Sequence, residues 1–444
     1  MNDCLPGPDR PDGSQKQKNK LNKFKQSIMK HSMILAAAAA LVLCACAKVE
    51  TVKITPDEAV SFGVYASNAT KAVSATDYST LTTDILKAST YGFGVFGYYT
   101  DAANYASNTK ANFMYNQQVT WASTKWTYSP VKYWPNEHGA SAKSTDTDKL
   151  TFLAYAPFVE NLAINGETES TVKDTAATAA ATEGIIAMTG NKMAEDAKLT
   201  FKVPASAEQQ IDLLYGVMAA KYADVEGDSI GVVGGPLQNL TKQKTDGKVE
   251  ILFKHALAKV AIDIREVVDQ KDTTSTVNPS SDGTKVVVKS VKLVGTEIGI
   301  QGKLNLYTGE WNVSSSDTMF TVAPLPAAIS VDAAPTAYPG IAGVDEDGLD
   351  KTIDLMLIPS AAPTTITGVE IVYYVCTEDA NLDGGVSVVE NKISKEFTSA
   401  LTLVQGKQYN LNLLLGLTSI ELDATVANWT VSSTTNVDLP KNVE

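Results

Sequence analysis

The chain is long, acidic and poor in the residues that build reactive sites. It has 444 residues, 44 % of them hydrophobic and 20 % charged, and a formal net charge of −13. A surface of this sign repels nucleic acid and anionic membrane faces, which excludes both as expected partners. The chain has only three histidines and four cysteines, and no HExxH, CxxC or phosphate-loop motif occurs in it. We therefore predict that it is not an enzyme and holds no cofactor and no metal.

A short apolar segment comes first. Residues Met33–Ala47 are apolar or nearly so, about fifteen residues against the roughly 20 that a membrane-spanning helix needs. This is typical of a signal peptide, and its end, the sequence LCAC, resembles the bacterial lipobox. By that resemblance Cys46 is acylated and starts a mature lipoprotein; the alternative is a plain signal peptide with incidental cysteines. Residues 1–45 are then a signal peptide with a non-native N-terminal extension, since translation from Met29 would suffice.

The mature chain is large enough for two domains without covalent support. Removal of residues 1–45 leaves 444 − 45, or 399, residues, with 37 − 7 = 30 basic and 50 − 3 = 47 acidic side chains. Such a length can bury two hydrophobic cores. Apart from Cys46, only Cys376 remains, so no disulfide can form within one chain and packing must supply the stability.

Short runs of period-two hydrophobicity, bounded by Gly, Pro, Asn and Asp, continue along the chain. In KQYNLNLLLG, for example, Tyr409, Leu411 and Leu413 face one way and the asparagines between them the other. This pattern predicts an all-β fold of the sandwich type. In chain order, strands are expected in VSFGVYA, YGFGVFGYYT, KLTFLAYAPF, VVVKSVKLVG, TIDLMLIP, GVEIVYYVC and KQYNLNLLLG.

Three segments are harder to interpret. Residues 249–264, VEILFKHALAKVAIDI, fit one long buried strand or a helix, and their β-branched residues favour the strand. Residues 175–190, rich in alanine, are expected to form a surface insertion or a short helix. Residues 266–285 are polar and rich in turn residues, so they predict a domain boundary, or else a long hairpin loop. We place an N-terminal β-sandwich domain at 46–270 and a C-terminal one at 271–444.

Aromatic residues and histidines offer few candidate contacts. Trp121, Trp126 and Trp134 lie close together in the sequence and could stack on sugar rings, although strand packing is the commoner use of such residues. His255 stands in an apolar stretch and is expected to be a hydrogen-bonded core residue. His138 fits a turn beside Glu137, and this pair makes no metal site.

Several sequence pieces occur in a characteristic order. VSFGVYASNATKA follows the lipobox, WTYSPVKYWPNE leads into KLTFLAYAP, and QQIDLLYG, FKHALAKVAIDI, GKQYNLNLLLG and ATVANWTV follow. This ordered set, from residue 46 to about 432, resembles the fimbrillin family of Bacteroidales cell-surface proteins, which includes fimbrial pilins. The resemblance implies two transthyretin-like, Greek-key β-sandwich domains in tandem, in a lipoprotein that reaches the outer membrane.

The resemblance also implies a way of assembling. In polymerising members a protease cuts after a basic residue and removes the first strand, and a strand from a neighbouring subunit fills the open groove. Mapped onto this chain, the displaced strand lies within Thr51–Tyr65 and Lys71 is the candidate cut position. The donor strand comes from the last segment, where Val431, Val437 and Leu439 are the candidate inserting residues. The implied partners are other fimbrial subunits, bound head to tail.

One feature departs from the family pattern. Polymerising members are often cut after arginine, yet the mature chain has a single arginine, Arg265, inside a predicted strand. Either a lysine-tolerant protease cuts at Lys71, or the first strand stays and the protein is an anchor, a tip subunit or an independent adhesin. We predict a structural or adhesive subunit of a surface fimbria. The alternative is a monomeric outer-membrane lipoprotein that binds a host or bacterial glycan or protein.

Overall fold

The structure is a computed structural model of the protein. Within the described residues the secondary structure is almost entirely β, which confirms the predicted all-β class. The described residues are 59–66, 81, 83–88, 91–100, 103–105, 111–135, 148–160, 162–165, 181–189, 197–206, 209–219, 233–245, 247–266, 285–322, 353–359, 364–383, 385–415 and 420–428.

One sheet is built mainly from the first half of the described chain. Its strand order is β1-β11-β9-β5-β2-β3-β4, and β10 also pairs with β5. Two short helices, α2 (Thr83–Ala88) and α3 (Lys242–Thr245), accompany it. The bounds of the strands are β1 Ser61–Tyr65, β2 Phe93–Tyr99, β3 Met114–Ala122, β4 Lys125–Thr127, β5 Leu150–Ala156, β9 Leu214–Met218, β10 Leu237–Leu240 and β11 Lys248–His255.

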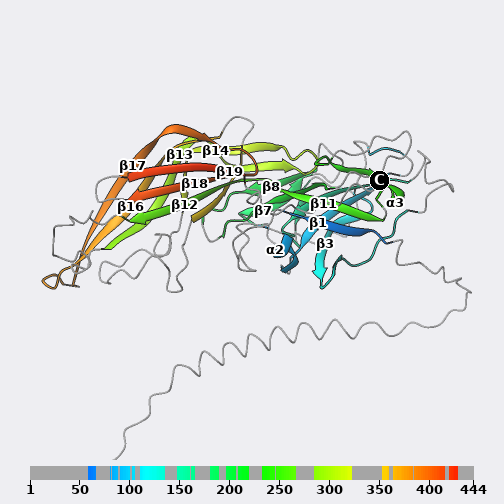
Figure 1. Cartoon of the computed structure of the whole chain (residues 1–444), viewed down its shortest axis with the longest axis horizontal. Helices are drawn as coiled ribbons and strands as arrows, with labels where there is room; N and C mark the ends of the chain where they lie inside the picture. The colour runs from blue at the N-terminus through cyan, green and yellow to red at the C-terminus, as the bar shows by residue number, and fades with distance from the viewer. Residues whose placement is uncertain are drawn as a thin grey trace, which may run out of the picture. The chain divides into compact units, whose positions relative to one another are not determined.

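Two further sheets contain β6–β8 and the strands from β12 onward (Figure 1). The order in the smaller is β15-β12-β18-β19, and in the larger it is β17-β16-β13-β8-β7-β6, with β14 also on β13. The smaller sheet has β12 Ala258–Glu266, β15 Ile353–Leu357, β18 Lys407–Leu415 and β19 Ile420–Asn428. The larger has β6 Ala163–Asn165, β7 Gly184–Thr189, β8 Lys198–Lys202, β13 Lys285–Asn305, β14 Trp311–Val322, β16 Thr365–Glu378 and β17 Val386–Thr402.

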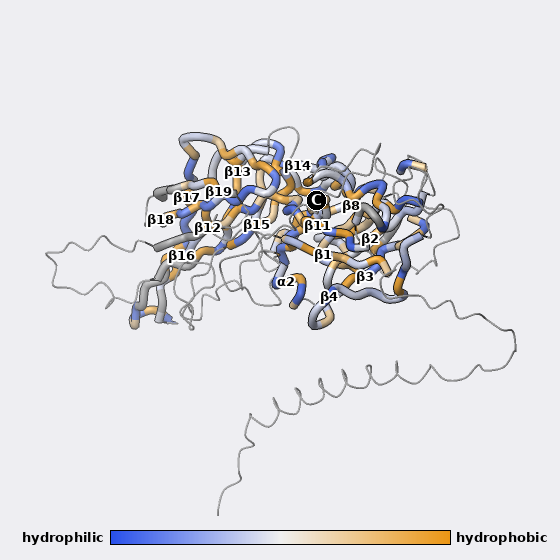
Figure 2. The backbone as a smooth tube through the Cα atoms, turned by 45° about the vertical axis from the view of Figure 1, so that its right-hand side comes forward, coloured by the Kyte–Doolittle hydropathy of each residue, from blue (hydrophilic) through white to orange (hydrophobic). Residues whose placement is uncertain are grey.

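Burial explains why some strands alternate and others do not. In β18 the side chains of Tyr409, Leu411 and Leu413 are all buried, as the alternation predicts. β5 is buried along its whole length: Phe152 belongs to one apolar cluster and Leu153 to another. A strand covered on both faces reads as a continuous apolar run. Figure 2 shows such hydrophobic stretches along the strands.

The prediction of one long strand at 249–264 was wrong. The segment forms two strands, β11 and β12, that belong to different sheets. They are separated by Ala256, whose N–H donates to the Leu213 carbonyl at 2.8 Å, and Leu257, whose carbonyl accepts from the Gly406 N–H at 2.9 Å. Since both residues are buried and bonded to other segments, the chain changes sheets there without an exposed loop.

This crossing bears on the domain boundary predicted at residues 270 and 271. β12 lies before that boundary but pairs with β15 and β18, which lie after it. β8, also before it, pairs with β13. The sheets therefore do not divide the chain at 270, and the position of a domain boundary stays a prediction.

The alanine-rich segment also differs from expectation in part. Residues Gly184–Thr189 form β7, which pairs with β8 and β6. Ile185 and Met188 are buried in the larger apolar cluster. This burial explains why the segment forms a strand of the sheet and does not lie on the surface as an insertion. Residues 175–180 lie outside the described part of the chain.

Candidate assembly site at the first strand

The first described strand lies at an edge of its sheet. β1 pairs in parallel with β11, with Ser61 opposite Lys248 and Tyr65 opposite Leu252, and it ends the strand order of that sheet. The two strands run side by side in Figure 1. An edge strand is joined to its sheet by a single ladder, and parallel ladders are slightly less stable per residue than antiparallel ones. Withdrawal of β1 would therefore break one ladder and, just before it, the isolated bridge between Ala59 and Tyr133.

The inner face of β1 is apolar and buried. Phe62 is 4 % exposed and Val64 is 6 % exposed, and both pack in a cluster with side chains of β2, β3, β5 and β11. The Phe62 ring lies edge-on to Phe93 and Phe152, with centroids 6.1 and 5.8 Å away. Burial of each such side chain contributes roughly 1.5–3 kcal/mol. The edge of β11 that β1 covers, together with the apolar surface beneath Phe62 and Val64, is called the β1 slot below.

The outer face of the β1 slot carries charge. Glu250 lies opposite Gly63 in the ladder, and its carboxylate forms an ion pair with the Lys248 ammonium at 2.8 Å. Glu250 is nevertheless only 8 % exposed. Burial, followed by the charge and the hydrogen bonding of Glu250, raises the pKa of Tyr65 to about 12. The Lys248 ammonium and the Tyr65 hydroxyl thus both interact with the partly desolvated carboxylate of Glu250.

The start of β1 is held by backbone groups. The Val60 N–H donates to the Lys132 carbonyl at 2.9 Å, and the Tyr128 hydroxyl donates to the Val60 carbonyl at 2.7 Å. The hydroxyl of Ser61 donates to the Gly247 carbonyl at 3.1 Å. Burial raises the pKa of Tyr128 to about 12, so its hydroxyl keeps the proton it donates at neutral pH.

The end of β1 is tied to α2. The Ala66 N–H donates to the Thr83 hydroxyl oxygen at 2.8 Å, and that hydroxyl faces the Ala66 carbonyl at 3.1 Å. Between Ala66 and Leu81 lie residues 67–80, which are outside the described residues and include the predicted cut position Lys71. The upstream end of this segment is thus fixed through Thr83.

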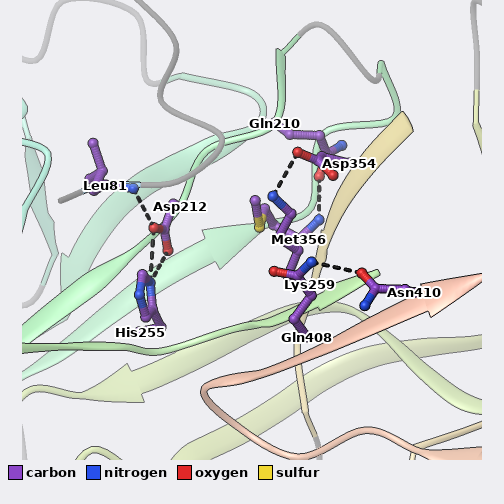
Figure 3. Close-up of polar contacts among 9 residues, drawn as sticks. All are labelled: Leu81, Gln210, Asp212, His255, Lys259, Asp354, Met356, Gln408 and Asn410. Atoms are coloured by element: carbon purple, nitrogen blue, oxygen red, sulfur yellow. Dashed lines mark hydrogen bonds and ion pairs between the residues drawn. The ribbon is translucent and has the colours of Figure 1, made fainter. Parts of the chain in front are cut away.

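The downstream end is fixed by a buried carboxylate. Asp212 accepts the Leu81 N–H at 2.7 Å, and its two oxygens lie 3.0 and 2.9 Å from Nδ1 of His255. Figure 3 shows Asp212 between the other two residues, and all three are buried. His255 is therefore the hydrogen-bonded core residue that the sequence predicts. The chain after residue 80 is attached to the body of the protein independently of β1.

The segment that carries Asp212 is itself anchored to the neighbouring sheet (Figure 3). The side-chain oxygen of Gln210 accepts the Met356 N–H of β15 at 2.8 Å. Next to it, Lys259 of β12 pairs with Asp354 of β15 at 2.7 Å. The Gln210 contact fixes the chain two residues before Asp212, which supports Asp212 as an anchor for Leu81.

The three candidate tryptophans have different surroundings. Trp126 and Trp134 are buried: Trp126 lies edge-on to Phe93 at 5.2 Å, and Trp134 Nε1 donates to the Gly247 carbonyl at 3.0 Å. Trp121 is partly exposed, and the Lys87 ammonium lies 5.0 Å from the centre of its ring. Burial leaves Trp126 and Trp134 a packing role. A sugar contact stays a prediction for Trp121.

Part of the last described strand, β19, is uncovered. Residues 424–427 of β19 are all exposed, and Val426 is 55 % exposed. Because successive strand residues point to opposite faces, neither face of this stretch is covered within the described part of the chain. Five predicted site residues lie outside the described residues: Cys46, Lys71, Val431, Val437 and Leu439.

The polar residues that hold β1 and Leu81 in place were not predicted from the sequence. Glu250, Asp212 and Thr83 carry no motif, and only their position next to apolar runs sets them apart. Among the residues that the structure describes, no three His, Cys, Asp or Glu side chains are grouped so as to hold a metal ion. In the same part of the chain, no helix has the length and hydropathy of a membrane span.

Comparison with known proteins assigns the chain to a family. The model of the fimbrillin-like family matches residues 57–429. The chain belongs to the fimbrillin-like family. It is 24 % identical over 381 residues to "Fimbrium subunit Fim1C" of Phocaeicola vulgatus, and the alignment covers 84 % of each protein. The family that the sequence pieces resemble is thus confirmed.

A solved structure has the same fold as this fimbrillin-like chain. A fimbrial protein from Bacteroides vulgatus superposes with a TM-score of 0.52 at 21 % identity, over 84 % of this chain and 100 % of that one. At this level of identity the likeness concerns the fold alone.

The packing of β1 predicts a clear contrast between two identical substitutions. We expect Val64→Ala to lower the free energy of unfolding by about 2–3 kcal/mol, because two buried methyl groups are lost and a cavity remains. Val426→Ala, at an exposed position of β19, should change it by no more than about 0.5 kcal/mol. Denaturant unfolding of both variants measures this, and equal effects would contradict the packing described for β1.

The tyrosine that holds Val60 predicts a pH dependence. The pKa of Tyr128 is raised from about 10 to about 12, so its contribution to stability is complete below about pH 10 and is lost as the pH rises towards about 12. We expect Tyr128→Phe to make stability fall less steeply over this range than in the parent chain. Tyr91→Phe, at a half-exposed position, is the control. Unfolding at stepped alkaline pH measures the slopes, and identical slopes for Tyr128→Phe and the parent would contradict the assignment.

Proposed function

We propose that the protein is a subunit of a bacterial surface fimbria that is exported as a lipoprotein and assembles by strand exchange. Membership in the fimbrillin-like family and the similarity to a fimbrium subunit support the fimbrial part. One observation carries the mechanism: β1 is an edge strand with a buried apolar face, and the segment that joins it to the body contains Lys71. Export would place the lipid on Cys46, upstream of this strand.

Cleavage after Lys71 would change what holds β1. Before the cut, β1 is continuous with Leu81 through residues 67–80. After the cut, only the ladder to β11, the buried side chains and the contacts of Val60, Ser61 and Ala66 would retain it. The lipid attached at Cys46 would leave with β1, so it would serve only to bring the subunit to the outer membrane.

The rest of the subunit would keep its structure after the cut. Leu81 stays bonded to Asp212, and Asp212 stays paired with His255. Thr83 belongs to α2, whose Ile85 and Leu86 are buried. The new N-terminus would therefore start on a segment that is fixed about ten residues later. This separation allows one strand to leave without unfolding the others.

An empty β1 slot would favour a replacement strand. Without β1 the edge of β11 is unpaired, and apolar side chains around Phe93 and Phe152 face water. A strand from a second copy can restore both the ladder and the apolar contacts. If that strand runs antiparallel to β11, the new ladder is also slightly more stable per residue than the one that it replaces.

The C-terminal segment is the proposed donor. It follows β19, whose residues 424–427 are exposed, and it offers Val431, Val437 and Leu439 as apolar anchors. Because slot and donor are different surfaces of the same chain, each bound copy exposes a new slot or donor, and the contact propagates head to tail. The partners are thus further fimbrial subunits at the cell surface.

We propose a structural and not a catalytic role. The sequence does contain one Gly-x-Ser-x-Gly match, GDSIG at 227–231, outside the described residues. In hydrolases that motif works on a strand-to-helix turn of an α/β sheet with a histidine in reach. Here the described strands on either side, β9 and β10, pair with their neighbours in an antiparallel manner. The chain also has only two histidines after Met33, His138 and His255. The match is best explained by chance.

Cleavage at Lys71 can be tested in a strain that makes the protein naturally. We expect Lys71→Gln to leave the chain at its lipoprotein mass and to abolish heat-resistant multimers, whereas Lys71→Arg keeps both processing and multimers. Lys125→Gln, at the exposed first residue of β4, is the control. Immunoblots of boiled and unboiled outer membranes measure both properties. Multimers of unchanged amount in Lys71→Gln would refute strand removal at this position.

A further inference from the structure

The outer face of the β1 slot is selective because of one carboxylate. Glu250 lies opposite Gly63, and a Cβ placed on Gly63 would overlap the Glu250 carboxylate and come within 2.9 Å of Lys248 Cε. Glycine is therefore required at residue 63 while Glu250 keeps its present position. Any other residue in this position would have to displace the Glu250 side chain.

Glu250 is held in that position by its neighbours. Its partner Lys248 lies on the same strand at 2.8 Å, whereas Tyr65, which also interacts with it, belongs to β1. When β1 leaves, the ion pair with Lys248 remains and the phenol of Tyr65 is lost. The Glu250 side chain can then turn away from this place, as any residue with a Cβ opposite it requires, and its carboxylate can accept a hydrogen bond from that residue. A second carboxylate at the same place would meet a like charge in a partly desolvated site.

We infer that Glu250 sets the register of the incoming strand from a second copy, by accepting a small hydroxyl residue and rejecting an acidic one between the two apolar anchors. This inference rests on the strand exchange proposed above and adds which part of the donor enters. The anchors replace Phe62 and Val64, and the residue between them takes the place of Gly63 opposite Glu250. Because this residue lies midway between the two anchors, it faces Glu250 whether the donor strand runs parallel or antiparallel to β11.

The C-terminal segment offers two anchor pairs of this spacing. In the sequence VANWTVSSTTNVDLP, Trp429 and Val431 flank Thr430, and Val437 and Leu439 flank Asp438. Asp438 would oppose Glu250 with like charge. The Thr430 hydroxyl can instead donate a hydrogen bond to the Glu250 carboxylate and replace the lost phenol of Tyr65. Among the three predicted inserting residues, the slot therefore favours Val431 over Val437 and Leu439.

A charge-swap experiment with the full-length chain in its native host tests this register. We expect Thr430→Asp to lower heat-resistant multimers at least about tenfold, because two carboxylates then face each other in the slot. Thr434→Asp, the same change outside the anchor triplet, should leave them unchanged. Combining Thr430→Asp with Glu250→Lys should restore multimers, because the facing charges then attract. Glu250→Gln in the same background should restore them in part, and it serves if Glu250→Lys impairs folding of the unprocessed chain.

The outcomes separate this inference from the proposal beneath it. Loss with Thr430→Asp and recovery with either Glu250 change supports the register. Normal multimers with Thr430→Asp, or no recovery with Glu250→Gln in a folded and processed chain, overturns the register while strand exchange still stands. If the unaltered chain is processed at Lys71 and forms no multimers, strand exchange itself is overturned, and the register falls with it.

Discussion

The structure depends on the fit of two apolar side chains into the edge of one sheet. Phe62 and Val64 complete the cluster that β2, β3, β5 and β11 line, yet the strand that carries them is paired on one side only. Side-chain burial thus binds β1 strongly while its backbone contributes a single parallel ladder. Under the proposed mechanism such a strand can be exchanged, because another strand with matching anchors and a suitable residue opposite Glu250 can make the same contacts.

The two ends of the segment that contains Lys71 are held in different ways. Upstream, the backbone N–H and carbonyl of Ala66 are hydrogen-bonded to the Thr83 hydroxyl. After a cut, these two bonds would be a weak non-covalent link between the end of β1 and α2. Downstream, Leu81 is bonded to the buried Asp212, which His255 supports. A single cut therefore divides the chain into a part that can leave and a part that stays folded. The proposed strand exchange depends on this asymmetry.

The sequence predicted the all-β class, the strand at Ser61–Tyr65 and the family correctly, because period-two patterns and ordered motifs are local properties. It failed at 249–264, because the break at Ala256–Leu257 depends on bonds to distant segments. It also gave no sign of Glu250. Which polar side chain faces β1 is decided by the register between strands that lie far apart in the chain, and periodicity within one strand cannot supply this.

The N-terminal mass of the chain isolated from heat-resistant multimers in native outer membranes tests most directly whether β1 is exchanged. We expect the chain in the multimers to begin at Ala72, with the lipid and β1 gone. A chain that begins at an acylated Cys46 in the same multimers would still carry β1 in its slot. It would contradict strand exchange and leave the protein as a lipid-anchored surface component.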